Sequence, residues 1–316
     1  MKLASIDIGT NSVLLLIAEL DKRRLTPIRS EVYITRLGQG VDKTQRLHPE
    51  AVERTVAILS DYAEICSQHD LSHIIVAGTS ALRDAANGEA FLRRVKDSLG
   101  WDIRILTGED EASLTFTATQ YEFNHLEEHY LVLDIGGGST EFMYGDNHAC
   151  RFFKSLNIGS VRFTEQYFTQ DPPARDILQQ VRKRIRHEMS SHLQSLSFDV
   201  KDTVLIGVAG TVTTLLAVEK QMAQYDPAQI HRQPLMRSQV EHLLEEFLSR
   251  TLEERKQLPG LQPGRADVII AGTLILLETM QVFGFDKLLV SDRGTRYGLL
   301  YEYMQSGDIP EHQPEC

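Results

Sequence analysis

The chain has 316 residues, 42% of them hydrophobic, and a formal net charge of −11 at pH 7. This length suits two domains of typical size, and the charge argues against non-specific binding of nucleic acid or anionic lipid. The three cysteines, Cys66, Cys150 and Cys316, lie far apart and form neither a zinc-binding spacing nor a disulfide framework. No apolar run approaches the length of a membrane span. The first predicted strand begins so close to Met1 that a signal peptide has no room, so we expect a cytoplasmic protein that does not cross a membrane.

The first predicted element is a hairpin over residues 5–20. An apolar run reaches Asp7, turns at Gly9-Thr10-Asn11-Ser12, and returns as a second apolar run. Small and polar residues at such a tip have an ordinary explanation, since glycine and asparagine are common in turns. They also have a chemical one, because the backbone N–H groups of a small-residue turn bind anions and a neighbouring carboxylate can hold a cation.

The rest of the first half alternates strands and helices. The pattern predicts a third strand before about residue 37, then helices over 49–66, 88–99 and 109–123, separated by strands over 73–77 and 101–106. The strand at 73–77 empties into Gly78-Thr79-Ser80, followed by Arg83. This order predicts a mixed sheet flanked by helices.

A second hairpin, over residues 130–145, repeats the plan of the first. The pattern D-I-G-x-x-S recurs with Asp134 lying 127 residues after Asp7, and the turn runs from Gly136 to Thr140. Two such hairpins at domain-length spacing indicate an internal duplication rather than two unrelated turns. After a third strand through Phe153, the pattern predicts a short helix over 159–168 and a long helix that begins after Asp171-Pro172 and ends at about Leu196. Further helices are predicted over 211–222, 239–249, 266–283 and 295–304, and strands at 203–208 and 287–290.

Four strand ends carry small-residue loops, at Gly9–Ser12, Gly136–Thr140, Gly210-Thr211 and Gly78-Thr79-Ser80, and such loops let backbone N–H groups approach phosphate oxygens closely because no Cβ intervenes. Asp7 and Asp134 occupy equivalent points of the two hairpins and would face one gap, which suits a single divalent ion or a water; Glu141 follows close by. The predicted phosphate-binding residues are Gly9, Thr10, Asn11, Ser12, Gly136, Gly137, Gly138, Ser139, Thr140, Gly210 and Thr211.

The remaining charged candidates have both structural and chemical explanations. Glu109, Asp110 and Glu111 open a predicted helix, where acidic residues complement the helix dipole. Four arginines, Arg83, Arg162, Arg293 and Arg296, each come just after a loop. The basic run from Arg182 to Met189 lies mid-helix, and we interpret it as a solvated face rather than a track for an anionic chain.

The paired hairpins resemble the actin-like (ribonuclease H-like) superfamily of sugar kinases, acetate kinase and actin. Seven ordered segments narrow the resemblance to the exopolyphosphatase/guanosine pentaphosphate phosphohydrolase (Ppx/GppA) family: IDIGTNSVLLLI, GTSALRDAANG, TGEDEA, LDIGGGSTE, NIGSVRFTEQYF, GVAGTVTTL and VSDRGTRYGLL. The resemblance implies an α/β fold of two actin-like domains with mixed sheets flanked by helices and an active site in the cleft between them. We expect domains over residues 1–124 and 125–316, with the last helix, about 295–306, packing back on the first domain.

The resemblance also implies roles for individual residues. The family's catalytic glutamate corresponds to Glu111, although the position before it is Asp110 here rather than glutamate; Glu141 is the competing candidate for the base. Asp7, Asp134 and Glu141 would hold Mg²⁺ or Mn²⁺, and Arg83 matches a family arginine that we assign to phosphate binding.

The function implied is a metal-dependent exopolyphosphatase that releases the terminal phosphate of inorganic polyphosphate. Three alternatives stay open: a guanosine pentaphosphate 5′-phosphohydrolase of the stringent response, an actin-like small-molecule kinase, and a non-catalytic module that senses a phosphorylated alarmone. The presence of all four acidic residues, Asp7, Glu111, Asp134 and Glu141, argues against the sensing module, because a protein that only binds its ligand needs no catalytic base. A homodimer is compatible with the sequence.

Overall fold

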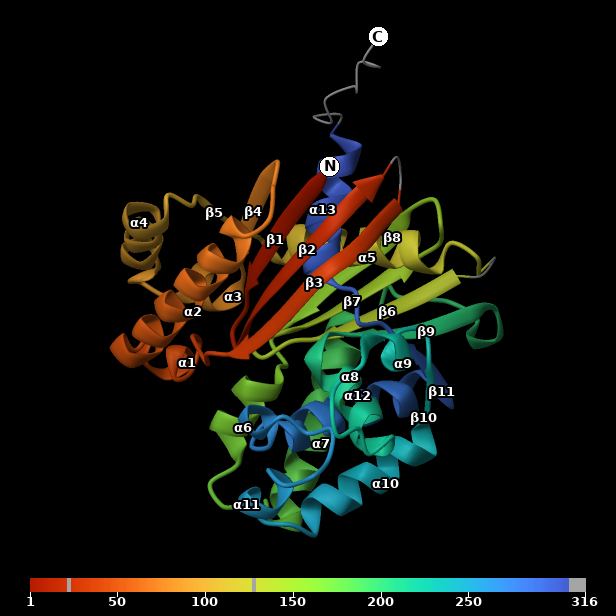
Figure 1. The fold of residues 1–316 in the computed structure, drawn as a ribbon. Helices are drawn as coiled ribbons and strands as arrows, with labels where there is room; N and C mark the ends of the chain where they lie inside the picture. Colours follow the sequence, from red (N-terminus) through yellow and green to blue (C-terminus); the bar gives the residue numbers. More distant parts are fainter. Residues whose placement is uncertain (22–23, 127–128, 307–316) are drawn as a thin grey trace.

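The computed structural model describes residues 1–21, 24–126 and 129–306, and it contains two mixed β-sheets (Figure 1). The first sheet has the order β3-β2-β1-β4-β5, and the second has the order β10-β11-β9-β6-β7-β8. The strands of the first are β1 (Lys2–Ile8), β2 (Ser12–Asp21), β3 (Arg24–Ile34), β4 (His73–Gly78) and β5 (Ile103–Ile105). Those of the second are β6 (His129–Ile135), β7 (Thr140–Gly145), β8 (Cys150–Leu156), β9 (Thr203–Val208), β10 (Pro234–Met236) and β11 (Lys287–Val290).

The two sheets share one topology. In each, an antiparallel three-stranded meander is continued by two parallel strands, so that β1, β2, β3, β4 and β5 correspond to β6, β7, β8, β9 and β11. Even the register matches, since Asp7 pairs with Leu14 and Asp134 pairs with Glu141. The predicted fold of two mixed sheets is confirmed, and the repeated order is what an internal duplication produces. Only β10, antiparallel to β11, has no counterpart in the first sheet.

Helices cover the outer faces of both sheets and fill the space between them. Beside the first sheet lie α1 (Val41–Thr44), α2 (Pro49–Ser67), α3 (Ser80–Asp84) and α4 (Gly88–Leu99). The second carries α6 (Ser160–Tyr167), α7 (Arg175–His192), α8 (Ala209–Glu219), α9 (Pro227–Ile230), α10 (Arg237–Leu248), α11 (Leu252–Arg255) and α12 (Ile269–Phe283), with 3₁₀ turns at Val200–Asp202 and Pro263–Arg265. None of the helices within the described ranges combines the length and apolar character that a membrane crossing requires.

Two helices, α5 (Gly108–Phe123) and α13 (Thr295–Gln305), lie between the sheets (Figure 1). Tyr297 and Leu300 of α13 pack with Leu3 and Leu16 of the first sheet. The other helix, α5, packs Phe116 against Val132 and Met143 of the second sheet. The helices meet closely, because a Cβ on Gly298 would lie 2.1 Å from the carbonyl oxygen of Leu114. The last helix therefore contacts the first sheet. The division at residue 124 stays a prediction, and residues 307–316 of the second predicted domain lie outside the described ranges.

The basic run of α7 is more than a solvated face. Lys183 and Arg184 are exposed, as predicted. Arg182 and Arg186, however, both form ion pairs with Glu278 of α12, whose side chain is fully buried. A buried carboxylate needs compensating positive charge, and these two arginines supply it. The solvated-face interpretation is therefore wrong for Arg182, which is largely covered, whereas Arg186 is exposed and also pairs with the buried carboxylate.

This pairing predicts a stability effect. Replacing both Arg182 and Arg186 with alanine is expected to lower the free energy of unfolding by about 3 kcal/mol, because the Glu278 carboxylate stays buried without a partner. Urea denaturation measures it. The matched control is Arg184→Ala on the same helix, which breaks a half-exposed pair with Glu188 and should cost less than about 1 kcal/mol. Equal losses in the two variants would contradict the assignment.

Candidate active site

The tips of the two hairpins have the same backbone geometry. The N–H of Gly9 donates to the carbonyl of Ser12 at 2.9 Å, and the N–H of Gly136 donates to that of Ser139 at 3.0 Å. Both tips line one cavity of about 600 Å³, together with residues from both halves of the chain. A cavity of this size accommodates a small-molecule ligand. The predicted loop residues that line it are Gly9, Thr10, Asn11, Ser12, Gly136, Gly137, Gly138, Ser139, Gly210 and Thr211.

The two hairpin loops lie in close contact at the edge of the cavity that both line. A Cβ on Gly137 would lie 3.1 Å from the side chain of Thr10, and a Cβ on Gly138 would lie 3.1 Å from the Oγ of Ser80. Thr10 and Ser80 share a hydrogen bond of 2.8 Å between their hydroxyls. Glycine at 137 and 138 therefore permits the close approach that places both loops around one space.

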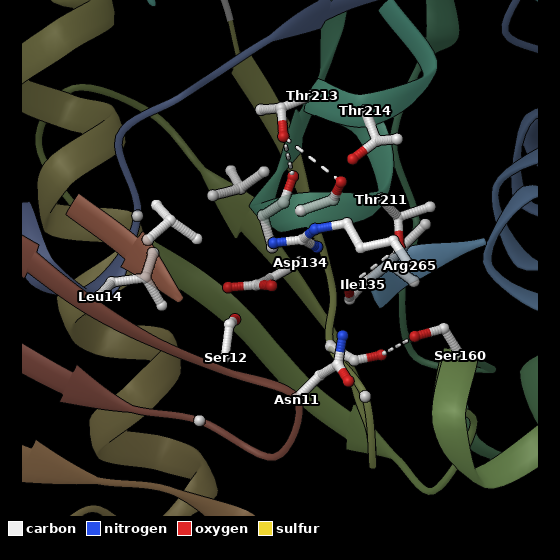
Figure 2. Close-up of a pocket in the computed structure, with 18 of the residues that line it drawn as sticks. Asn11, Ser12, Leu14, Asp134, Ile135, Ser160, Thr211, Thr213, Thr214 and Arg265 are labelled. Carbon is white, nitrogen blue, oxygen red and sulfur yellow. Dashed lines mark hydrogen bonds between the residues drawn. The ribbon is translucent and has the colours of Figure 1, made fainter. Parts of the chain in front are cut away.

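Three of the four predicted carboxylates line this cavity: Asp7, Glu111 and Asp134. Figure 2 shows the Asp134 carboxylate and the Ser12 hydroxyl directed into the same space, with Asn11 beside it and the Arg265 guanidinium across it. Glu141 lies outside the cavity lining. It is 2% exposed, sits opposite Asp134 on the neighbouring strand, and accepts a hydrogen bond from Ser155 Oγ at 2.7 Å.

The start of α5 explains why Glu111 is the acidic residue that reaches the cavity. Thr107 and Asp110 form a reciprocal capping box, in which the Thr107 N–H donates to Asp110 Oδ2 at 3.0 Å and the Asp110 N–H donates to Thr107 Oγ1 at 3.1 Å. Glu109 is exposed to solvent. Asp110 is thus engaged at the helix start, where it satisfies otherwise unpaired backbone groups, and Glu111 faces the site.

The carboxylates raise one another's pKa. Burial, followed by the charge of Asp134, raises the pKa of Asp7 to about 7. Burial raises the pKa of Asp134 to about 6 against a weak hydrogen bond from Thr115. Burial and then Asp134 raise the pKa of Glu141 to about 7, and burial and then Glu141 raise the pKa of Glu111 well above its usual range. Such mutual repulsion is relieved when a cation or a proton enters.

The donor set suits a magnesium or manganese ion. The Oδ1 atom of Asp7 and the Oε2 atom of Glu111 are buried and have no hydrogen-bond partner among the described residues. Within the same residues, no cluster of three or more His, Cys, Asp or Glu side chains is arranged to enclose a metal. Mg²⁺ does not require such a cage, because it keeps several waters and binds one or two carboxylates together with substrate phosphates. Asp7 and Asp134 therefore fit the ion that the sequence predicts.

Two predicted phosphate-binding residues do not line the cavity, although the positive charge of Arg83 opposes the rise in the pKa of Glu111 and of Glu141. The guanidinium of Arg83 donates to the carbonyl of Leu106 at 2.8 Å, and its side chain does not line the cavity. The hydroxyl of Thr140 is fully buried and donates to the carbonyl of Ile158. The loop residues from Gly136 to Ser139 therefore line the cavity, whereas the side chains of Arg83 and Thr140 do not.

The other arginines after loops divide between scaffold and cavity. Arg162 pairs with Asp42 at 2.6 Å, and Arg293 pairs with the buried Glu122 at 2.5 Å. Arg296, by contrast, lines the cavity.

Sequence reasoning missed Arg265, a half-buried residue that reaches the cavity from the 3₁₀ turn before α12. A Cβ on Gly210 would lie 1.6 Å from its Nη1 atom, so its guanidinium occupies the space that glycine leaves. Burial lowers the pKa of Arg265 to about 10, and it forms no ion pair with any described residue. No local pattern around Pro263–Arg265 marks this residue, because only long-range packing brings it to Gly210.

Comparison with known proteins decides the family. The family model for the Ppx/GppA phosphatase family matches residues 16–307 of the chain. The chain belongs to the Ppx/GppA phosphatase family. It is 34% identical to exopolyphosphatase 2 of Mycobacterium tuberculosis, over 94% of this chain and 97% of that protein. It is also 36% identical to a bifunctional 3-dehydroquinate synthase/phosphatase of Fusobacterium nucleatum, over 96% of this chain and 46% of that longer protein.

Solved structures of Ppx/GppA proteins share the fold. The crystal structure of the Aquifex aeolicus family member superimposes with a TM-score of 0.82 at 34% identity, covering 98% of this chain and 99% of that one. An exopolyphosphatase from Cytophaga hutchinsonii gives a TM-score of 0.89 at 25% identity, covering 97% and 98%. The family predicted from the seven sequence segments is thus confirmed.

Proposed function

We propose that this Ppx/GppA protein is an exopolyphosphatase that hydrolyses the terminal phosphoanhydride bond of inorganic polyphosphate. The observation that carries the proposal is the cavity lined by the small-residue tips of two equivalent hairpins. Beside them lies the Glu111 carboxylate, whose buried Oε2 atom has no hydrogen-bond partner among the described residues. The loops offer backbone N–H groups to a terminal phosphoryl group. The similarity to exopolyphosphatase 2 of M. tuberculosis supports the same substrate.

The proposed reaction is an in-line attack by water on the terminal phosphorus. Glu111 accepts the proton of that water as its oxygen bonds to phosphorus, and the bridging P–O bond breaks. Orthophosphate leaves, and the chain becomes one phosphate shorter. The loops Gly9–Ser12 and Gly136–Ser139 bind the charge on the phosphoryl oxygens, which is the main catalytic need in phosphoryl transfer.

Asp7 and Asp134 would hold Mg²⁺ or Mn²⁺, which neutralises phosphate charge when bound. Glu141 is hydrogen-bonded to Ser155 behind Asp134, and we assign it to support of the metal and water positions. A cytoplasmic location and a homodimer stay predictions.

A second candidate, guanosine pentaphosphate 5′-phosphohydrolase, is favoured by one feature of the cavity. Beyond the loop at Gly210 the lining combines polar side chains, including Thr213 and Arg265, with four apolar ones and with the exposed aromatic ring of Tyr225. Polyphosphate has no apolar part to contact these apolar side chains, whereas a nucleoside has. The four apolar residues are Met222, Leu261, Val268 and Ile269.

One assay tests both candidates. Phosphate release is measured from polyphosphate, guanosine pentaphosphate and ATP in parallel, with and without Mg²⁺. Polyphosphate is expected to have the highest kcat/KM. A higher value for guanosine pentaphosphate would assign the second function, and tight binding without release from any of the three would favour the sensing module instead.

A further inference from the structure

Arg296 occupies a position in the cavity that neither hairpin explains. It is the second residue of α13, lines the cavity, and its side chain is 5% exposed. Its carbonyl accepts a hydrogen bond from the buried Ser5 hydroxyl of β1 at 2.7 Å. The helix start is thereby fixed against the first sheet, and the guanidinium is directed between the two halves of the chain.

The hydrogen bonds of this guanidinium are few and long. Nη1 donates to Ser30 Oγ at 3.0 Å, and Nη2 donates to the carbonyl and to Oδ2 of Asp292, both at 3.4 Å. Charge-assisted N–H···O bonds are normally 2.7–2.9 Å long, and an arginine carries five N–H donors. The other carboxylate oxygen of Asp292 accepts from the Tyr225 hydroxyl instead. A nearly buried cation therefore has only long hydrogen bonds to its charged partner, beside a cation–π contact 5.7 Å from the centroid of the Tyr297 ring, and retains unused donors.

The charge of Arg296 acts on the same space as the hairpins. Its guanidinium opposes the rise in the pKa of Asp7, so the two groups lie within electrostatic range of each other. Asp292 and Tyr225 also line the cavity. An anionic group that enters the cavity in addition to the one at the hairpins could therefore bind the Arg296 guanidinium, which already lies in the cavity wall. It would replace Asp292, the present partner of that guanidinium.

We propose that Arg296 binds a non-reacting phosphate of the substrate chain, and that Asp292 holds the guanidinium until the anion replaces it. The proposal rests on the proposed function, since it takes the substrate to be a phosphoanhydride chain. It assigns Arg296 to substrate binding and Asp292 to positioning. Because Asp292 competes with the anion, the two residues should have opposite effects on affinity.

The experiment measures binding without turnover. Tripolyphosphate is titrated by calorimetry, in the presence of Mg²⁺, into variants made in a Glu111→Gln background. Arg296→Met is expected to raise Kd roughly ten- to a hundredfold, the range for loss of hydrogen bonds to a charged group. Arg296→Lys keeps the charge but loses the planar fork, so it should fall between. Asp292→Asn is expected to lower Kd, because the competing charge is gone.

Arg104→Met is the matched control, since it also removes a positive charge beside α13, at exposed pairs with Glu302 and Asp110 outside the cavity. It should leave Kd within about twofold. An unchanged Kd in Arg296→Met, or weaker binding in both Arg296→Met and Asp292→Asn, would overturn the proposal. Should Arg296→Met not fold, as judged by thermal unfolding, Arg296→Lys and Asp292→Asn still decide it. Failure of phosphate release by the wild-type protein would count against the proposed function only.

Discussion

Replacing Glu111 with glutamine is expected to lower kcat by about 10²–10⁴-fold while changing KM little. Glutamine keeps the shape of the side chain but cannot accept the proton of the attacking water. The hairpin loops that bind phosphate are untouched, because Glu111 enters the cavity from α5 rather than from either loop. Steady-state phosphate release from polyphosphate measures both constants.

Two matched variants make this result specific to Glu111. Glu109→Gln alters the same helical turn but is exposed to solvent, so it should leave kcat within about twofold. Glu141→Gln tests the competing base. If Glu141→Gln loses the activity while Glu111→Gln keeps nearly all of it, the base is Glu141, and the role taken from the resemblance at G-E-D-E-A is wrong.

The hairpins could be predicted because the information is local. A strand that ends in Asp-Ile-Gly and resumes after a serine specifies its own turn, and the same string at Asp7 and at Asp134 gives the same hydrogen bond across each tip. The repeated sheet order follows from this repeat. The short helices α1, α3, α9 and α11 and the strand β10 were not predicted, because a helix of four or five residues is little more than one turn and shows no helical periodicity, and β10 has only three residues.

The partners of the charged residues could not be predicted, because they depend on long-range packing. Arg182 meets Glu278 across 96 positions of sequence, and nothing near either residue marks the other. Arg265 likewise reaches Gly210 only through the packing of the turn before α12. Even the duplication misleads locally, because the position opposite Asp7 is Leu14, whereas the position opposite Asp134 is Glu141. The second hairpin therefore carries two facing carboxylates, whereas the first carries only Asp7 at the equivalent pair of positions.

Exhaustive chelation with EDTA is expected to abolish phosphate release, and added Mg²⁺ or Mn²⁺ is expected to restore it. The reason is the crowding of carboxylates around the cavity, where Asp7 Oδ1 has no hydrogen-bond partner among the described residues and must share the space with Asp134. A phosphate chain adds further negative charge to the same space. Full activity after complete removal of divalent ions would contradict the metal assignment.

Thermal unfolding gives a readout that does not depend on activity. The pKa values of Asp7 and Asp134 are raised in the folded state, from 3.8 to about 7 and about 6, so without metal the protein should lose stability as the pH rises from about 4 to 7. Saturating Mg²⁺ at pH 8 should therefore raise Tm by roughly 5 °C or more. In Asp7→Asn/Asp134→Asn the repulsion is already absent, so Tm without metal should be no lower than that of the wild type, and Mg²⁺ should no longer raise it. Glu109→Gln, which removes an exposed charge near the site, should keep the full Mg²⁺ response; an equal response in the double variant would show that the ion binds elsewhere.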